Sequence, residues 1–462
     1  MVSVSDAGAG LRAGFGKVEI SARAKGAELV GYPYRGGGAL SIRDPLFARA
    51  LVMQCGAGQV AICSLDVLYV NEDIVEAARR QIARDTGISA ECVFVSASHT
   101  HSGPFDDDPA CWPEGLHAKI SEAVAEAQRR LEPARIGAGF GMLYGHSLNR
   151  RRLEDPVDPA VFVIRIDDMR GRALGAYYGF GCHPVVLGPD TQHVSGDWVS
   201  SAARTIETSL GELAVAVFGQ GASGDVNPLT DGVRRRFAES RTVQARIHEL
   251  PLAGESHYYG NRDGTVDQFD IGDRTGGSFA EAGQLGEAVA AEVLRVHRGI
   301  LFSDVTRLWT ARITAGGSPS AVAGPAAEDP WQGRGDRVRP RVGPGRPLEV
   351  MVLAIEGPDI MLVGQPGEIF SETGIGLRRE LRQAGIRYPF VVGYANGWRA
   401  YLPPARAFPE GGYEVLWALE MGTPESLQEE VRAGVLKVLD DRRQVRTDAK
   451  VPDGRAGGPV HQ

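Results

Sequence analysis

VFVSASHTHSGP, residues 93–104, joins a run of β-forming residues to two histidines and a Gly-Pro turn. The run predicts a buried strand over residues 92–97. Side chains two apart on a strand point to the same side, so His99 and His101 should face one point beyond its carboxyl end, where α/β proteins place their sites. Neutral imidazole is a ready zinc ligand. The pair predicts a metal or catalytic site, and two polar histidines at a strand exit are the alternative.

Strands and helices alternate along the rest of the chain, which is typical of an α/β layer fold. We predict further strands at 47–54, 60–65, 135–140, 160–166, 173–179, 213–218, 305–314, 348–355, 360–363 and 390–393. Helical periodicity predicts helices at 73–86, 114–131, 198–209, 278–297, 371–384 and 424–440.

These elements predict a single α/β catalytic domain with mixed sheets over residues 1–440, with 302–440 as a candidate subdomain. Residues 234–277 and 316–347 are rich in glycine or polar residues and are predicted to form long loops. Residues 441–462 are expected to be a disordered tail.

The composition restricts the partners of the chain. Its net charge of −8 argues against nucleic acid or an anionic membrane as the main partner, because phosphate binding needs a clustered positive surface. No window approaches the roughly 18 continuous apolar residues of a membrane span, and the first residues do not resemble a signal peptide. The five cysteines have no CxxC spacing, which favours reduced thiols in a cytoplasmic enzyme. The oligomeric state stays open.

Two more histidines follow the predicted strand 173–179. His183 stands at a glycine turn, GCHP at residues 181–184, and a third strand-end histidine strengthens the prediction of a metal site. A buried histidine packed at the turn is the alternative. His193 is assigned either to the surroundings of the site or to the loop surface.

Three later segments place polar groups after strands or turns. GQGASGDVNP, residues 219–228, has glycines that let the backbone approach a ligand and present amides to an oxyanion, although a tight structural turn is an equal alternative. Glu368 follows a short strand and a Pro-Gly turn, and carboxylates are ordinary zinc ligands. Tyr401 by itself favours a structural role, because a phenol ligand must be ionised against a free pKa of about 10.

In this order, the segments resemble the neutral (alkaline, non-lysosomal) ceramidase family over roughly residues 12 to 440. The matching segments are HTHSGP at 99–104, HP at 183–184, GDV at 224–226, PGE at 366–368, and Asn396 to Tyr401 leading to Tyr413-Glu414. GY at 31–32 and DPLFARA at 44–50 also look like the N-terminal region of the family.

The resemblance implies a zinc ion and a set of residues around it. The implied ligands are His99, His183, Glu368 and Tyr401. His101 would lie beside the metal as an acid/base or orienting group, and Arg150 and Tyr413 match site residues of the family.

One position in the implied site departs from the family. Its turn reads Gly-Asp-Val-Ser-Pro, whereas this chain has Asn227 in place of the serine. An asparagine donates hydrogen bonds but is no nucleophile. We expect the chain to lack the C-terminal immunoglobulin-like domain of neutral ceramidases, and ceramide is therefore expected to carry over poorly as the substrate.

The function predicted from these observations is a zinc-dependent amidohydrolase that cleaves an N-acyl or other amide bond of a small molecule with activated water. Asn227, backbone amides and Arg150 would stabilise the oxyanion, and His101 would protonate the leaving amine. Alternatives at the same metal site are ester or lactone hydrolysis, acyl transfer and intramolecular cyclisation. A true ceramidase and a non-catalytic metal-binding protein are weaker alternatives.

Overall fold

The structure is a computed structural model that describes residues 2–4, 10–32, 35–234, 277–316 and 346–448. The predicted loops 234–277 and 316–347 lie almost entirely outside these residues, as do residues 449–462 of the predicted tail. Within the described part, every helix is too short or too polar to span a bilayer.

The first sheet has eight strands in the order β12-β10-β9-β7-β2-β4-β5-β6. β5–β6 and β10–β12 are the parallel pairs, and the other neighbours are antiparallel. α1 (Glu72–Thr86) joins the first parallel pair and α3 (Asp197–Leu210) the second. The strands are β2 (Leu11–Glu19), β4 (Phe47–Cys55), β5 (Gly58–Leu65), β6 (Val93–Ala97), β7 (Glu132–Met142), β9 (Ala160–Asp168), β10 (Ala173–Phe180) and β12 (Val215–Gln220).

The second sheet has five strands in the order β1-β14-β15-β16-β18, in which only β16 and β18 pair in parallel. α7 (Ser371–Gln383) connects that pair. The strands are β1 (Val2–Val4), β14 (Arg307–Ala315), β15 (Leu348–Glu356), β16 (Ile360–Gly364) and β18 (Tyr388–Val392). Both sheets are mixed, which confirms the predicted α/β fold class.

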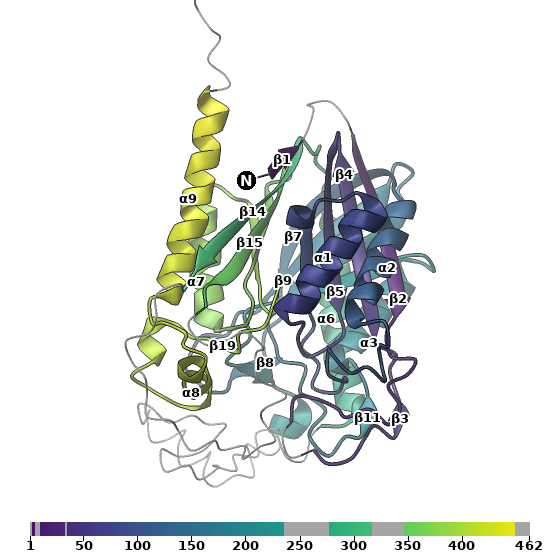
Figure 1. Cartoon of the computed structure of the whole chain (residues 1–462), viewed down its shortest axis with the longest axis vertical. Helices are drawn as coiled ribbons and strands as arrows, with labels where there is room; N and C mark the ends of the chain where they lie inside the picture. Colours follow the sequence, from purple (N-terminus) through teal and green to yellow (C-terminus); the bar gives the residue numbers. More distant parts are fainter. Residues whose placement is uncertain (1, 5–9, 33–34, 235–276, 317–345, 449–462) are drawn as a thin grey trace, which may run out of the picture.

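Alternating side chains of β15 pack the second sheet on both faces. Met351, Leu353 and Ile355 share one core cluster with the first sheet, whereas Val350 and Val352 share another with α7 and α9 (Leu427–Asp448). This is the period-two pattern of a strand buried on both sides. Helices α1, α2 (Leu116–Arg129), α3 and α6 (Phe279–Gly299) cover the first sheet, and α7 and α9 lie beyond the second (Figure 1).

Strand β2 and the end of helix α9 were not expected from the sequence. β2 was not predicted, because Gly14 and Gly16 interrupt its apolar pattern; a Cβ at Gly14 would lie 2.2 Å from the backbone oxygen of Ala127, so the glycine allows close contact with α2. Helix α9 continues to Asp448, so residues 441–448 are helical rather than part of a tail.

Several short elements complete the fold. They are β3 (Ser41–Ile42) paired with β11 (His193–Val194), β8 (Ser147–Asn149) with β13 (Val226–Pro228), β17 (Glu368–Ile369) with β19 (Tyr401–Leu402), the 3-10 helices Ala90–Cys92 and Ala405–Ala407, and α8 (Tyr413–Glu420).

Candidate metal centre

The carboxyl ends of strands from both sheets meet at one place. Gly393, just after β18, donates its backbone N–H to the Gln220 carbonyl at the end of β12 (2.9 Å), and Ala97 of β6 donates to the Tyr394 carbonyl (3.1 Å). Gln365, just after β16, donates to the Val392 carbonyl (2.9 Å). Side chains that follow these strands are therefore brought together, as is usual for sites in α/β proteins.

His99 and His101 lie beyond the end of β6 rather than on it. The predicted strand ends at Ala97, and His99 has a left-handed φ of 70°. The expectation that His99 and His101 face one side because they alternate along a strand is therefore wrong. The turn nevertheless brings the Nε2 atoms of His99 and His101 to 3.2 Å from each other. Positive φ values also occur at Tyr394, Asn396 and Ala400, and such backbone strain clusters at functional sites.

Two histidines are oriented by backbone carbonyls. His99 Nδ1 donates to the Leu68 carbonyl at 2.8 Å, and His183 Nδ1 donates to the Ser223 carbonyl at 2.7 Å. Because a carbonyl only accepts, these bonds assign the proton to Nδ1 and leave each Nε2 lone pair available.

A carboxylate and a tyrosine complete the donor groups. Glu368 Oε2 lies 3.0 Å from His183 Nε2 and 3.6 Å from His99 Nε2. Glu368 and Tyr401 are direct register partners of the parallel pair β17–β19, so this short ladder places them side by side. The structure thereby brings together all four residues that the resemblance implies as ligands.

The donor set fits a metal ion. Ligand atoms of His99, His101 and His183 all lie within 4.8 Å of one another, and all three rings are buried or half-buried. Imidazole nitrogens with an adjacent carboxylate oxygen are the donors that zinc prefers. The three-histidine cluster could therefore bind a metal. His101 lies within the same distance of the other two rings as the implied ligands His99 and His183 lie of each other.

Burial keeps the three imidazoles in the neutral state that binds a metal, whereas it acts in the opposite direction on Glu368. Burial lowers the pKa of His99 to about 3 and holds the pKa values of His101 and His183 well below their usual range. The imidazoles are thus neutral near pH 7. Burial raises the pKa of Glu368, against the opposing effect of His99 and Arg150.

Arg150 connects the donor groups to the predicted catalytic residues. Its Nη2 donates to the Tyr401 hydroxyl at 2.8 Å, its Nε to Glu414 at 3.0 Å, and its Nη1 reaches Asn227 Oδ1 at 3.4 Å. The Tyr413 ring centroid lies 5.6 Å from that of Tyr401. All predicted site residues are therefore in one contact network.

Two members of this network, Tyr394 and Glu414, were not predicted as site residues from the sequence. Tyr394 stacks on His99 with ring centroids 4.0 Å apart, and its hydroxyl donates to Glu368 at 3.2 Å. Glu414 is completely buried and accepts hydrogen bonds from both Arg150 and Arg151. Tyr394 stands directly after a strand and Gly393, which is the same signal that identified His183.

His193 lies outside this network in the described part of the chain. Its Nδ1 pairs with the Ser41 hydroxyl at 2.9 Å, and its ring packs near Phe279. This assigns His193 to the β3–β11 loop region, one of the two alternatives that the sequence left open.

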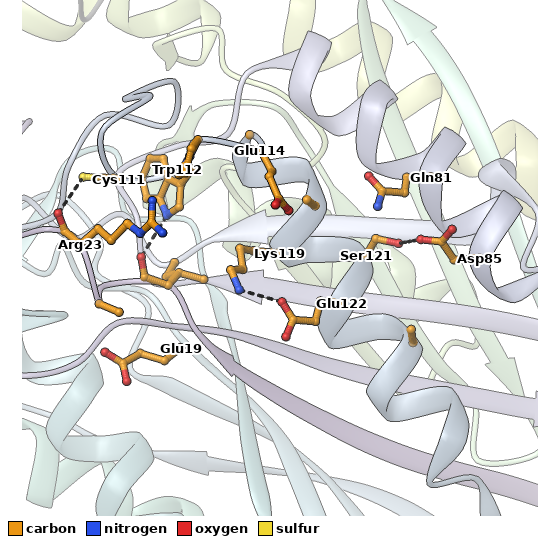
Figure 2. A pocket seen from close by; sticks show the side chains of 16 residues that line it. Glu19, Arg23, Gln81, Asp85, Cys111, Trp112, Glu114, Lys119, Ser121 and Glu122 are labelled. Atoms are coloured by element: carbon orange, nitrogen blue, oxygen red, sulfur yellow. Dashed lines mark hydrogen bonds and ion pairs between the residues drawn. The ribbon is translucent and has the colours of Figure 1, made fainter.

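A separate pocket of about 440 Å³ lies between the end of β2, α1 and α2 (Figure 2). None of the residues discussed above lines it. Lys119 donates to Glu122 at 2.8 Å and Ser121 to Asp85 at 2.8 Å, so polar side chains of this pocket already pair with one another.

Comparisons with known proteins agree with the predicted resemblance. No family model matches the sequence. The chain is 23% identical to the neutral ceramidase of Pseudomonas aeruginosa, over 96% of this chain and 74% of that protein. It is 24% identical to the neutral ceramidase of Mycobacterium tuberculosis, over 87% of this chain and 73% of that protein.

Solved structures show the same fold. The crystal structure of the Pseudomonas aeruginosa neutral ceramidase matches with a TM-score of 0.71 at 17% identity, covering 98% of this chain and 77% of the other. A ceramidase complexed with C2 matches with a TM-score of 0.69 at 18% identity and the same coverage. The mixed-sheet fold of the neutral ceramidase catalytic domain is thus confirmed.

Proposed function

We propose that this chain, a distant homologue of the neutral ceramidases over nearly its whole length, is a zinc-dependent amidohydrolase that cleaves an N-acyl or other amide bond of a small molecule. The observation that carries the proposal is the convergence of the Nε2 atoms of His99 and His183 on the carboxylate of Glu368. Each of these imidazoles is aimed by a carbonyl bond at its other nitrogen, which is the usual arrangement of histidine ligands.

The proposed ligands are His99, His183, Glu368 and Tyr401. A bound zinc ion supplies a nucleophile from water near neutral pH and polarises a carbonyl oxygen. Tyr401 is the least usual of the four, because burial holds the pKa of its phenol well above the usual value. The positive charge of Arg150, whose Nη2 donates to the phenol oxygen at 2.8 Å, opposes that effect.

The surrounding residues would carry the proton and the developing charge. His101 stands beside the ligand set, and as a neutral imidazole it would take a proton from the attacking water and donate it to the leaving amine. The guanidinium of Arg150 and the side-chain amide of Asn227 provide hydrogen-bond donors for an oxyanion. Tyr413 packs against Tyr401 at the same place and would contact the substrate.

A second candidate keeps the site but changes the bond that is cleaved. Asn227 stands where the resembling family has a serine, and its side-chain oxygen meets Arg150. An ester or lactone has a better leaving group than an amide and requires less protonation of that group. Ester or lactone hydrolysis, acyl transfer or cyclisation would then replace amide cleavage.

Metal analysis and a substrate panel test the proposal. The purified protein should contain about one zinc per chain, as in catalytic zinc enzymes, and His183→Ala should lose it. His193→Ala is the matched control, because this histidine bonds Ser41 instead, and it should keep the metal.

Mass spectrometry on N-acyl amines, ceramides, esters and lactones then separates the candidates. Turnover of simple N-acyl amines supports the amidohydrolase. Turnover restricted to esters or lactones supports the second candidate, and normal zinc content in His183→Ala would refute the site.

A further inference from the structure

His101 differs from the other two histidines of the cluster in how its ring is held. His99 and His183 each bond a backbone carbonyl through Nδ1. His101 Nδ1 is buried and has no hydrogen-bond partner among the described residues. Packing, rather than a hydrogen bond at Nδ1, must therefore set the orientation of this imidazole.

The backbone of Gly31 packs closely against this ring. Its φ is +110°, and a Cβ added there would lie 2.6 Å from both Cγ and Nδ1 of His101. The imidazole thus rests directly on the Gly31 backbone, where any side chain would displace it.

Tyr32 and Arg35, which lie in the N-terminal region, contact the loop that carries His101. The Tyr32 ring lies 5.0 Å from the His101 ring, and its hydroxyl donates to the Leu187 carbonyl at 3.0 Å. Arg35 lies over the Tyr32 ring at 4.9 Å and donates to the carbonyls of His101 (2.6 Å) and Gly188 (3.1 Å). These contacts connect the loop after β6 with the loop after β10.

The position of Arg35 supports a role in holding these loops. Its side chain is buried, and the hydrogen bonds described for its guanidinium all go to backbone carbonyls. Burying a cation is costly unless its hydrogen bonds are made. Here one bond goes to the loop that carries His101, and the others go to the loop that follows His183.

We propose that Gly31, Tyr32 and Arg35 are positioning residues that hold the His101 imidazole with Nε2 directed at the metal-binding cluster. Only the kinetic test of this proposal depends on the proposed function. A misplaced catalytic group costs up to about a hundredfold in rate.

Gly31→Ala tests the packing directly. We expect kcat to fall about tenfold to a hundredfold, with KM changed less than about twofold and zinc content unchanged. Gly26→Ala is the matched control: Gly26 has a φ of +85° but open space around its Cβ position. It should carry similar backbone strain and leave kcat unchanged.

A double-mutant cycle separates positioning from general damage. When His101→Ala has removed the ring, Gly31→Ala should cause little further loss of kcat. An equal loss with and without the ring would overturn the proposal. Arg35→Gln should lower kcat in the same way and Arg35→Lys should restore part of it; equal loss in both would also count against the proposal.

Ring-nitrogen NMR of the metal-free protein provides a test that needs no activity. Gly31→Ala should shift the His101 imidazole signals and leave those of His183 in place. If the wild type hydrolyses no amide, the proposed function fails while these signals still test the positioning. Unchanged His101 signals in Gly31→Ala, or in Tyr32→Leu if Gly31→Ala does not fold, would refute it.

Discussion

The two sheets contribute chemically different halves of the candidate site. Loops after β6 and β10 of the first sheet supply imidazole nitrogens, from His99, His101 and His183. The short strands β17 and β19, which follow β16 and β18 of the second sheet, supply oxygens from Glu368 and Tyr401. Neither sheet carries a mixed donor set by itself, so the proposed site exists only where the sheets pack together.

The halves also differ in how they are held. The imidazoles of His99 and His183 are oriented by carbonyls from loops of the first sheet. Tyr401, in contrast, accepts a hydrogen bond from Arg150, which lies directly after β8 and far from Tyr401 in sequence. The His99 and His183 rings are therefore oriented by hydrogen bonds from within the first sheet's loops, whereas Tyr401 of the oxygen half depends on a hydrogen bond from a distant segment.

Removing donors from either half gives the largest expected effect. His99→Ala and Glu368→Gln should each lose zinc and reduce activity by more than about a hundredfold. Removing a residue that only hydrogen-bonds a metal ligand already costs up to about a hundredfold, and these variants remove the ligands themselves. Metal analysis and initial rates measure both. Zinc retained in Glu368→Gln but lost in His99→Ala would show that the nitrogen half alone binds the metal.

Loosening the contact between the sheets should damage stability and metal binding together. Phe390 stacks on Phe162 with ring centroids 5.0 Å apart and fills the space beside Gly179. Phe390→Ala should lower the free energy of unfolding by about 3–5 kcal/mol, measured by denaturant titration, and weaken zinc affinity.

Leu381→Ala is the control for that variant, because Leu381 packs in the cluster between the second sheet and its helices. It should cost about 2–5 kcal/mol without weakening zinc affinity in the folded protein. Equal loss of zinc affinity in both variants would contradict a special role for the contact between the sheets.

A pH series tests the nitrogen half in the metal-free protein. Burial lowers the pKa of His99 from 6.5 to about 3 in the folded state, so only the unfolded chain takes up this proton between those values. The free energy of unfolding should therefore fall as pH drops below about 6.5. His99→Ala should show a shallower fall, and an identical slope would argue that His99 is not buried as a neutral ring.

The smallest effect is expected at Asn227. Its contact with Arg150 is long, at 3.4 Å, and an ordinary hydrogen bond contributes only about 0.5–1.5 kcal/mol. Asn227→Ser should change kcat/KM by less than about tenfold, measured on the best amide of the panel. Serine keeps a hydrogen-bond donor at this position, so a larger loss would show that the oxyanion needs the side-chain amide of Asn227 specifically.

Local patterns predicted much of the fold and the members of the site. The apolar periodicities predicted the strands of the three parallel pairs in the two large sheets and the helices between them, and strand-end polar residues indicated His99, His183 and Glu368. Tyr401 was selected only through the resemblance, because a lone tyrosine after a turn has no distinctive local signal. Glu414 was missed as a site residue for a related reason: its role depends on Arg150 and Arg151, which lie far away in sequence.

The sequence by itself determined which donor chemistry the chain possesses and that it stands at the ends of strands, because side-chain type and strand periodicity are local properties. Only the tertiary structure decided that the two sheets bring those ends together and that Glu368 pairs in register with Tyr401. It also decided that His101 rests on Gly31. Such contacts join segments that are far apart in the chain, and they form only when the complete core selects one packing of the sheets.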